Sequence, residues 1–294
     1  MNQKFKGIFP ALITPFAPDG QIDEGALRRL VRLNLNKGVD GFYVDGSTGE
    51  AFLLSMPERK RILDVVSDEA KGKCTLIYHV GCIGTGQAIE LAKHGEAIGV
   101  DAISAVPPFY YKFTFEEIKN YYFDIVNAVN LPMIIYNIPA FSGVTLTSEN
   151  LKQFIENNQI IGVKHTAMDL YQLNRMKQVD PELIVYNGHD EVFLAGLAMG
   201  ADGAIGSTYN FMAEKFIQIN QLYHNGQINE AQLIQNEANE IIEALIKVGV
   251  FQGIRYILKA KGLDCGECRK PFKILTQAEQ GLLDQIIAKY QFQI

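Results

Sequence analysis

The feature that most restricts the fold of this chain is a regular alternation of short apolar runs with longer segments of helical spacing. The runs are rich in β-branched residues, and a polar loop follows each of them. Eight runs are present by residue 206, which corresponds to about 26 residues per unit, the size of a βα repeat. The strand-like runs span residues 7–14, 41–45, 75–80, 101–106, 133–137, 160–165, 183–187 and 202–206.

Several of these runs are almost entirely apolar, for example residues 133–135 and 160–163. Such strands are typical of a parallel sheet that is covered on both faces. Sequential units without a reversal of order favour a fold of the α/β class, a closed (β/α)8 TIM barrel, over a doubly wound sheet. The glycine-rich turn expected after the first strand of a doubly wound sheet is replaced here by Ile13-Thr14-Pro15-Phe16. Helices are predicted at 23–37, 57–70, 86–99, 115–129, 147–157, 169–178 and 191–199.

The strand signal stops after residue 210, and four segments with apolar stripes follow at 211–224, 228–247, 250–261 and 277–290. One of these helices completes the eighth unit. We therefore expect a single domain of residues 1–294, with the barrel in 1–225 and C-terminal helices packed on it in 226–294.

Composition and residue spacing exclude several classes of partner and cofactor. The net charge is −6 and the basic residues are scattered, which argues against a nucleic acid partner and against binding to anionic membranes. No window approaches about 20 uninterrupted apolar residues, and the N-terminus lacks the pattern of a signal peptide. The four cysteines do not form a disulfide framework, so a cytoplasmic protein is expected. Neither the five histidines nor Cys265 and Cys268 have the spacing of a metal site.

In a barrel of this kind the reactive residues collect at the carboxyl ends of the strands. Lys164 ends the apolar run 160–163. Burial at that position disfavours the ammonium form and frees the amine as a nucleophile. The alternative for Lys164 is a solvated or carboxylate-paired lysine at a strand end.

Other strand ends carry polar residues, each of which has either a functional or a purely structural role. The turn Gly46-Ser47-Thr48-Gly49 presents backbone N–H groups that suit a small carboxylate or phosphate, or it caps the next helix. Tyr136 and Tyr110 are either proton carriers or half-buried aromatic residues. Asp190-Glu191 either binds a polyol or caps the helix that follows.

Two of these motifs together resemble the dihydrodipicolinate synthase / N-acetylneuraminate lyase family of class I aldolases. The G-S/T-T-G-E loop of that family matches Gly46-Ser47-Thr48-Gly49-Glu50, and its Y-x-x-P…K segment matches Tyr136-Asn137-Ile138-Pro139 with Lys164. The resemblance covers essentially the whole chain. It is strongest to the lyase branch, because Phe141 stands where the synthase branch has the arginine that binds its substrate's carboxylate.

The resemblance implies a Schiff-base enzyme that cleaves N-acetylneuraminate reversibly to pyruvate and N-acetylmannosamine. Such an enzyme needs no cofactor or metal, because the imine itself accepts the electrons. The resemblance also implies a homotetramer. The catalytic residues implied are Lys164, Tyr136, Ser47 and Tyr110, the last reaching into a neighbouring subunit's site. The substrate-binding residues implied are Ser47, Thr48, Thr166, Gly188, Asp190, Glu191 and Ser207.

Two alternatives compete with this function. One is another pyruvate-dependent aldolase of the same family, such as dihydrodipicolinate synthase. The other is a non-catalytic regulator that binds sugar acids, against which the intact set of Lys164, Tyr136, Ser47 and Thr48 argues.

Overall fold

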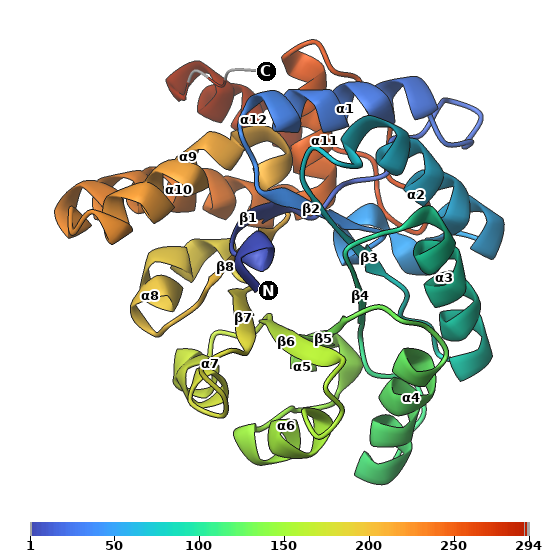
Figure 1. Cartoon of the computed structure of the whole chain (residues 1–294). Coiled ribbons are helices and arrows are strands. Elements are labelled where there is room, and N and C mark those ends of the chain that lie inside the picture. Colours follow the sequence, from blue (N-terminus) through green and yellow to red (C-terminus); the bar gives the residue numbers. More distant parts are fainter. Residues whose placement is uncertain (1, 291, 293–294) are drawn as a thin grey trace.

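Eight parallel strands form a barrel that is almost closed (Figure 1). The computed structural model describes residues 2–290 and 292, so positions 1, 291, 293 and 294 of the predicted domain lie outside the described residues. The strands follow one another around the barrel in chain order. They are β1 (Gly7–Pro10), β2 (Gly41–Val44), β3 (Thr75–His79), β4 (Ala102–Ala105), β5 (Met133–Asn137), β6 (Ile160–His165), β7 (Ile184–Asn187) and β8 (Gly203–Gly206). The predicted barrel is confirmed.

The first strand is shorter than the predicted run 7–14, because residues 11–14 leave the sheet. Ala11 forms only an isolated parallel bridge with Tyr43, and Leu12 N–H donates to the Tyr43 carbonyl at 3.0 Å. This contact closes the barrel between β1 and β2. Thr14 then donates its hydroxyl to the carbonyl of Gly49 at 2.7 Å, so the end of the run supports the turn that follows β2.

The apolar residues of the strands divide into two cores, because side chains alternate between the faces of a strand. One core lies inside the barrel and includes Phe9, Tyr43, Ile134, Tyr136 and Tyr186. The other lies between the strands and the outer helices. The N-terminal helix η1 (Asn2–Phe5) brings the buried Phe5 ring into the inner core, where Tyr186 donates its hydroxyl to the Phe5 carbonyl.

The outer helices begin at residues that cap them well. Ser55 and Glu58 form a capping box at the start of α2, as do Thr114 and Glu117 at α4. The ring of helices consists of α1 (Glu24–Asn36), α2 (Met56–Ala70), α3 (Thr85–Ile98), α4 (Phe115–Asn127), α6 (Ser148–Phe154), α7 (Leu170–Lys177), α8 (Phe193–Ala198) and α9 (Tyr209–His224). A short helix that the sequence analysis did not predict, α5 (Pro139–Ser142), lies at the end of β5.

Three helices follow the barrel: α10 (Ile228–Val248), α11 (Val250–Ala260) and α12 (Gln277–Lys289). In Figure 1, α9 and α10 run side by side at the edge of the barrel. Buried residues of α10 and α11 belong to the same outer core as the strands. The break between α9 and α10 falls at the predicted boundary near residue 225, while the division into one domain stays a prediction. Among the described residues, no helix has the length and apolar character needed to span a bilayer.

Candidate active site

The barrel brings Lys164 and Tyr136 side by side at its carboxyl end. They are directly paired in the register of β5 and β6, and the exposed fractions are 4% for Lys164 and 3% for Tyr136. Lys164 Nζ lies 3.9 Å from the centre of the Tyr136 ring and 4.4 Å from that of Tyr43. Within the described residues, Nζ has no hydrogen bond or ion pair with any carboxylate. Nζ is therefore removed from water and packed against aromatic rings.

A side-chain hydrogen bond joins the same two strand ends on their other face. Asn137 Nδ2 donates to His165 Nδ1 at 2.9 Å, and His165 Nε2 donates to the carbonyl of Asp169 at 3.0 Å. These two residues follow Tyr136 and Lys164 directly and are paired in the same register. Burial lowers the pKa of His165, which keeps its ring neutral and able to accept from Asn137. The bond fixes the backbone that carries the reactive pair.

The turn after β2 is the second part of the site, and we call residues 46–50 the Ser47 loop. Its short 3-10 helix η2 (Ser47–Gly49) is closed by N–H bonds from Gly49 and Glu50 to the carbonyls of Gly46 and Ser47. The N–H groups of Ser47 and Thr48 have no protein partner among the described residues. The Thr48 hydroxyl lies 2.6 Å from that of Ser207 at the end of β8. The loop therefore offers two backbone donors and nearby hydroxyls to an anion.

Helix α11 and the segment that follows it hold the Ser47 loop in place. Glu50 has a left-handed backbone (φ 60°), and its buried carboxylate accepts from Arg255 of α11 at 2.6 Å and from the Arg269 N–H at 2.8 Å. Arg255 also donates to the carbonyl of Thr14 at 2.6 Å. Both side chains of the Glu50–Arg255 pair are almost fully buried. A residue with positive φ that is not glycine persists only where its surroundings determine it, and this ion pair does so.

Three buried polar residues lie beneath the Ser47 loop and the Tyr136 ring. Arg59 of α2 is 3.4 Å from the Asp45 carboxylate and donates to the His79 carbonyl at 2.6 Å. His79 Nδ1 donates to the Asp45 carbonyl at 2.8 Å, and its ring packs edge-on against Tyr136. Burial raises the pKa of Asp45 to about 7 although Arg59 opposes the shift, and burial lowers the pKa of His79. His79 is therefore a neutral packing residue that joins β3 to Asp45, the residue before the Ser47 loop.

Residues that follow β6, β7 and β8 form a polar wall, which meets the Ser47 loop at Ser207. Asp190 Oδ2 accepts from the N–H and hydroxyl of Thr208 at 3.0 and 2.7 Å, while Oδ1 is buried without a partner among the described residues. Burial raises the pKa of Asp190 to about 6. Asp190 thus joins the end of β7 to the residue that follows β8. The polar wall consists of Thr166, Gly188, His189, Asp190, Glu191 and Ser207.

These parts surround one cavity of about 230 Å³. Its lining includes every predicted site residue except Tyr110. Ile242, Ile246 and Val250 of the C-terminal helices complete its apolar side. Their contribution was not predicted, because on the sequence they belong to the apolar stripes of helices far from the strand ends. Arg255 was missed for the same reason, and no local motif marks it.

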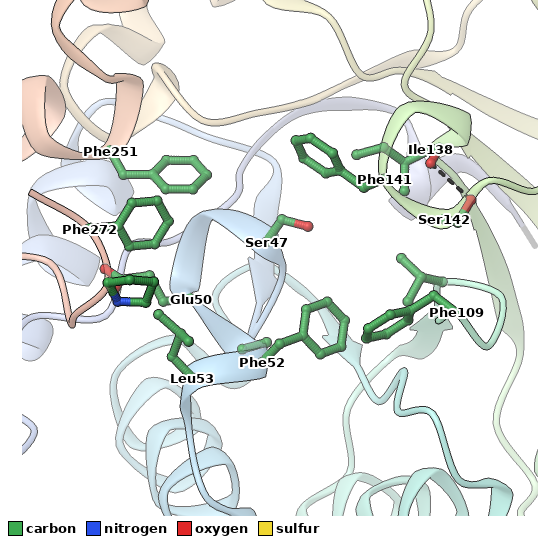
Figure 2. Close-up of a pocket in the computed structure, with 13 residues that line it drawn as sticks. Ser47, Glu50, Phe52, Leu53, Phe109, Ile138, Phe141, Ser142, Phe251 and Phe272 are labelled. Atoms are coloured by element: carbon green, nitrogen blue, oxygen red, sulfur yellow. Dashed lines mark hydrogen bonds between the residues drawn. The ribbon is translucent and has the colours of Figure 1, made fainter. Parts of the chain in front are cut away.

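Tyr110 lies away from the cavity of its own chain. It is 84% exposed with a φ of 78°, and its ring stacks edge-on against Tyr111, which is 66% exposed. A second, apolar cavity of about 360 Å³ adjoins the first and shares Ser47, Ile138, Phe141 and Phe251 with it. Figure 2 shows Ser47 at its centre, with the rings of Phe251 and Phe272 on one side and those of Phe52 and Phe109 on another.

Comparison with known proteins places this site in a family. Residues 4–290 match the family described as "Dihydrodipicolinate synthetase family". The chain belongs to this family. Membership confirms the predicted resemblance, and the matched residues include both signature segments, the Ser47 loop and the stretch from Tyr136 to Lys164.

Similar proteins separate the branches of the family. The chain is 46% identical to an N-acetylneuraminate lyase of Salmonella paratyphi B over 274 residues, 92% of each chain. The solved N-acetylneuraminate lyase of Fusobacterium nucleatum, complexed with pyruvate, is 42% identical, with a TM-score of 0.94 and 98% of each chain covered. A solved dihydrodipicolinate synthase has a TM-score of 0.92 but only 28% identity, with 97% of this chain and 99% of that chain covered. The two solved structures have similar TM-scores, because both branches share this fold. The higher sequence identity to the lyases therefore favours the lyase branch.

Proposed function

We propose that this protein is a class I aldolase that cleaves N-acetylneuraminate to pyruvate and N-acetylmannosamine, reversibly, through an imine on Lys164. The observation that carries the proposal is the desolvated Nζ of Lys164, 3.9 Å from the centre of the Tyr136 ring, in the same cavity as the Ser47 loop. The lyases at 42–46% identity support the choice of substrate. Phe141 at the cavity mouth provides no cation for the carboxylate of a synthase substrate.

The chemistry assigns a step to each part of the site. The Lys164 amine attacks the C2 ketone of the open-chain sugar acid, and loss of water gives the imine. The substrate carboxylate binds the N–H groups of Ser47 and Thr48. Tyr136 takes the proton of the C4 hydroxyl as the C3–C4 bond breaks, and C4 leaves as the aldehyde of N-acetylmannosamine. The electron pair of the broken bond forms the C2=C3 double bond of an enamine, while the imine nitrogen accepts the C=N pair. Tyr136 then returns the proton to C3, and addition of water to the imine releases pyruvate and restores Lys164.

The polar wall is proposed to bind the polyol tail of the sugar acid through Thr166, Gly188, Asp190, Glu191 and Ser207. The Thr166 hydroxyl is a buried polar group without a partner among the described residues. Buried polar atoms of this kind are expected to have a hydrogen-bonding partner. The hydroxyl groups of a polyol provide such partners.

Reduction with borohydride in the presence of pyruvate tests the imine. We expect a pyruvyl-sized adduct on the peptide that contains Lys164 and none in Lys164→Arg. Lys152→Arg, which changes an exposed lysine paired with Glu149, should trap pyruvate like the wild type. No adduct on any lysine of the folded protein would overturn the mechanism. Much faster cleavage of another 2-keto acid than of N-acetylneuraminate would overturn the substrate.

We propose further that the protein is a homotetramer in which Tyr110 of one copy approaches the site of the next. Support comes from the two exposed tyrosines, Tyr110 and Tyr111, and from the apolar cavity beside Ser47, because exposed apolar surface of this kind marks protein interfaces. Light scattering should give the mass of four 32.8 kDa chains. A monomer with full activity would refute the role of Tyr110. A cytoplasmic location is proposed from the four free cysteines.

A further inference from the structure

His189 lies on the polar wall between two residues proposed to bind the sugar, yet neither the family motifs nor the mechanism above gives it a role. Its side chain is 31% exposed, and Nδ1 lies 3.5 Å from Glu191 Oε1. The His189 carbonyl accepts from Asn187 Nδ2 at 2.6 Å and from the Val192 N–H at 3.2 Å. These two bonds fix the backbone of His189 just after the end of β7.

Helix α10 fixes the neighbouring carboxylates from the other side. Gln235 donates to the Asp190 carbonyl at 3.0 Å, and Asn239 donates to the Glu191 carbonyl at 3.0 Å. The 3-10 helix η4 (Asp190–Val192) is thus held between the barrel and the C-terminal helices. Because the backbone is held in this way, the direction of the Glu191 carboxylate depends on its own rotamer and on the ion pair with His189.

The charges around His189 favour its protonated form. Hydrogen bonding to Glu191 raises the pKa of His189, burial opposes this, and the charges of Glu191 and Asp190 add to the rise while Lys164 of β6 reduces it. Burial alone would raise the pKa of Glu191, but the bond to His189 brings it below its ordinary value. His165, also on β6, is the other titratable neighbour, and its ring is neutral. The α10 and α11 residues that line the cavity beside the polar wall are apolar.

Apart from His189, the charged residues of the polar wall provide only hydrogen-bond acceptors to a ligand. Asp190 and Glu191 present carboxylate oxygens, whereas each hydroxyl group of a polyol both donates and accepts. No hydrogen bond within the described part of the chain uses His189 Nε2. A protonated His189 therefore supplies one N–H donor in addition to the bond that orients Glu191.

We propose that His189 is a specificity-determining residue for the polyol chain of the substrate: it holds the Glu191 carboxylate toward the cavity and donates through Nε2 to a substrate hydroxyl. The inference rests on the proposed function and adds the residue that selects a neutral, polyhydroxylated chain over a short 2-keto acid. The donor is lost as the pH rises through the raised pKa of His189.

Steady-state kinetics of His189→Gln from pH 5.5 to 8.5 tests this role. Loss of a charge-assisted hydrogen bond should raise KM for N-acetylneuraminate about tenfold at low pH, with kcat within about twofold of the wild type. The wild-type KM should rise with pH toward that of the variant, whose KM should be independent of pH. A 4-hydroxy-2-keto acid without a polyol chain should give equal KM values for both proteins.

His94→Gln is the matched control, because His94 forms the same kind of pair with Asp64 at 2.8 Å on the outer helices. It should leave KM and its pH dependence unchanged. A wild-type KM in His189→Gln would overturn the inference, as would an equal rise of KM for the short 2-keto acid. Failure of the proposed function is distinguishable, since it abolishes borohydride trapping of pyruvate in the wild type, whereas His189→Gln should trap pyruvate normally.

Discussion

Replacing Arg255 with methionine tests whether the C-terminal helices hold the Ser47 loop in place. The guanidinium donates to Glu50 at 2.6 Å and to the carbonyls of Thr14 and Cys265 at 2.6 and 2.7 Å. The exposed side-chain fractions of Arg255 and Glu50 are 3% and 0%. Methionine keeps the apolar stem and removes every donor, so the Glu50 carboxylate remains buried without a countercharge.

The magnitude follows from burial. Breaking a buried ion pair by removing one partner costs about 3–5 kcal/mol. With an unfolding entropy of about 2.1 cal/mol/K per residue, each kcal/mol shifts the melting temperature of a chain of this length by about 1.6 °C. We therefore expect Arg255→Met to lower the melting temperature by about 5–8 °C. The loss should also raise KM for pyruvate in the condensation direction, because the loop donors move.

Scanning calorimetry and initial rates measure the two effects. The matched control is Arg61→Met, which breaks a similarly short pair with Glu24 at 2.6 Å whose side chains are 51% and 37% exposed. Solvent screens such a pair, so the control should melt close to the wild type with unchanged KM. Equal shifts of the melting temperature in both variants would refute the reasoning, because burial would then not decide the cost.

Three further changes test other contacts of the site. Asn137→Ala removes the bond to His165 and should lower kcat about tenfold with a stability loss of about 1–3 kcal/mol; a wild-type kcat would contradict the positioning role. Gly188→Ala places a methyl carbon 2.0 Å from Thr166 Oγ1, so KM for the sugar acid should rise. An unchanged KM would exclude a role of the Thr166 hydroxyl in binding the sugar acid. Because burial raises the pKa of Asp190 from 3.8 to about 6, its carboxyl group stabilises the fold below pH 3.8 and loses this contribution as the pH approaches 6. The melting temperature of Asp190→Asn relative to wild type should therefore rise between pH 4 and about 7; a constant difference would refute the shift.

The order of strands and helices was predictable, because each unit repeats the same change from strand-like to helical spacing of its apolar residues. Alternating strand and helix periods predicted the eight units, and the helix predicted at 57–70 begins within one residue of α2 (Met56–Ala70). Lys164 and Tyr136 were also predictable as neighbours, because both end successive parallel strands of one barrel, and such ends meet at one rim.

Other contacts were not predictable, because the residues that make them are far apart in the chain and carry no local motif. Glu50 and Arg255 are separated by 205 positions and meet only because α11 packs under the Ser47 loop. Helix α5, in contrast, carries local signals, because Pro139 lies in its first turn and Gly143 caps its end with a φ of 68°. It was missed because four residues are too few to show helical spacing.

Local periodicity and side-chain chemistry are enough to predict the alternation of strands and helices and the residues at the strand ends. Which other residues share a cavity with Lys164 and Tyr136 depends on the tertiary structure. It placed Tyr110 outside the cavity of its own chain, and it brought α10 and α11 against the site. The physical reason is that desolvation and the Glu50–Arg255 and His189–Glu191 pairs depend on distances between distant segments, which local sequence does not encode.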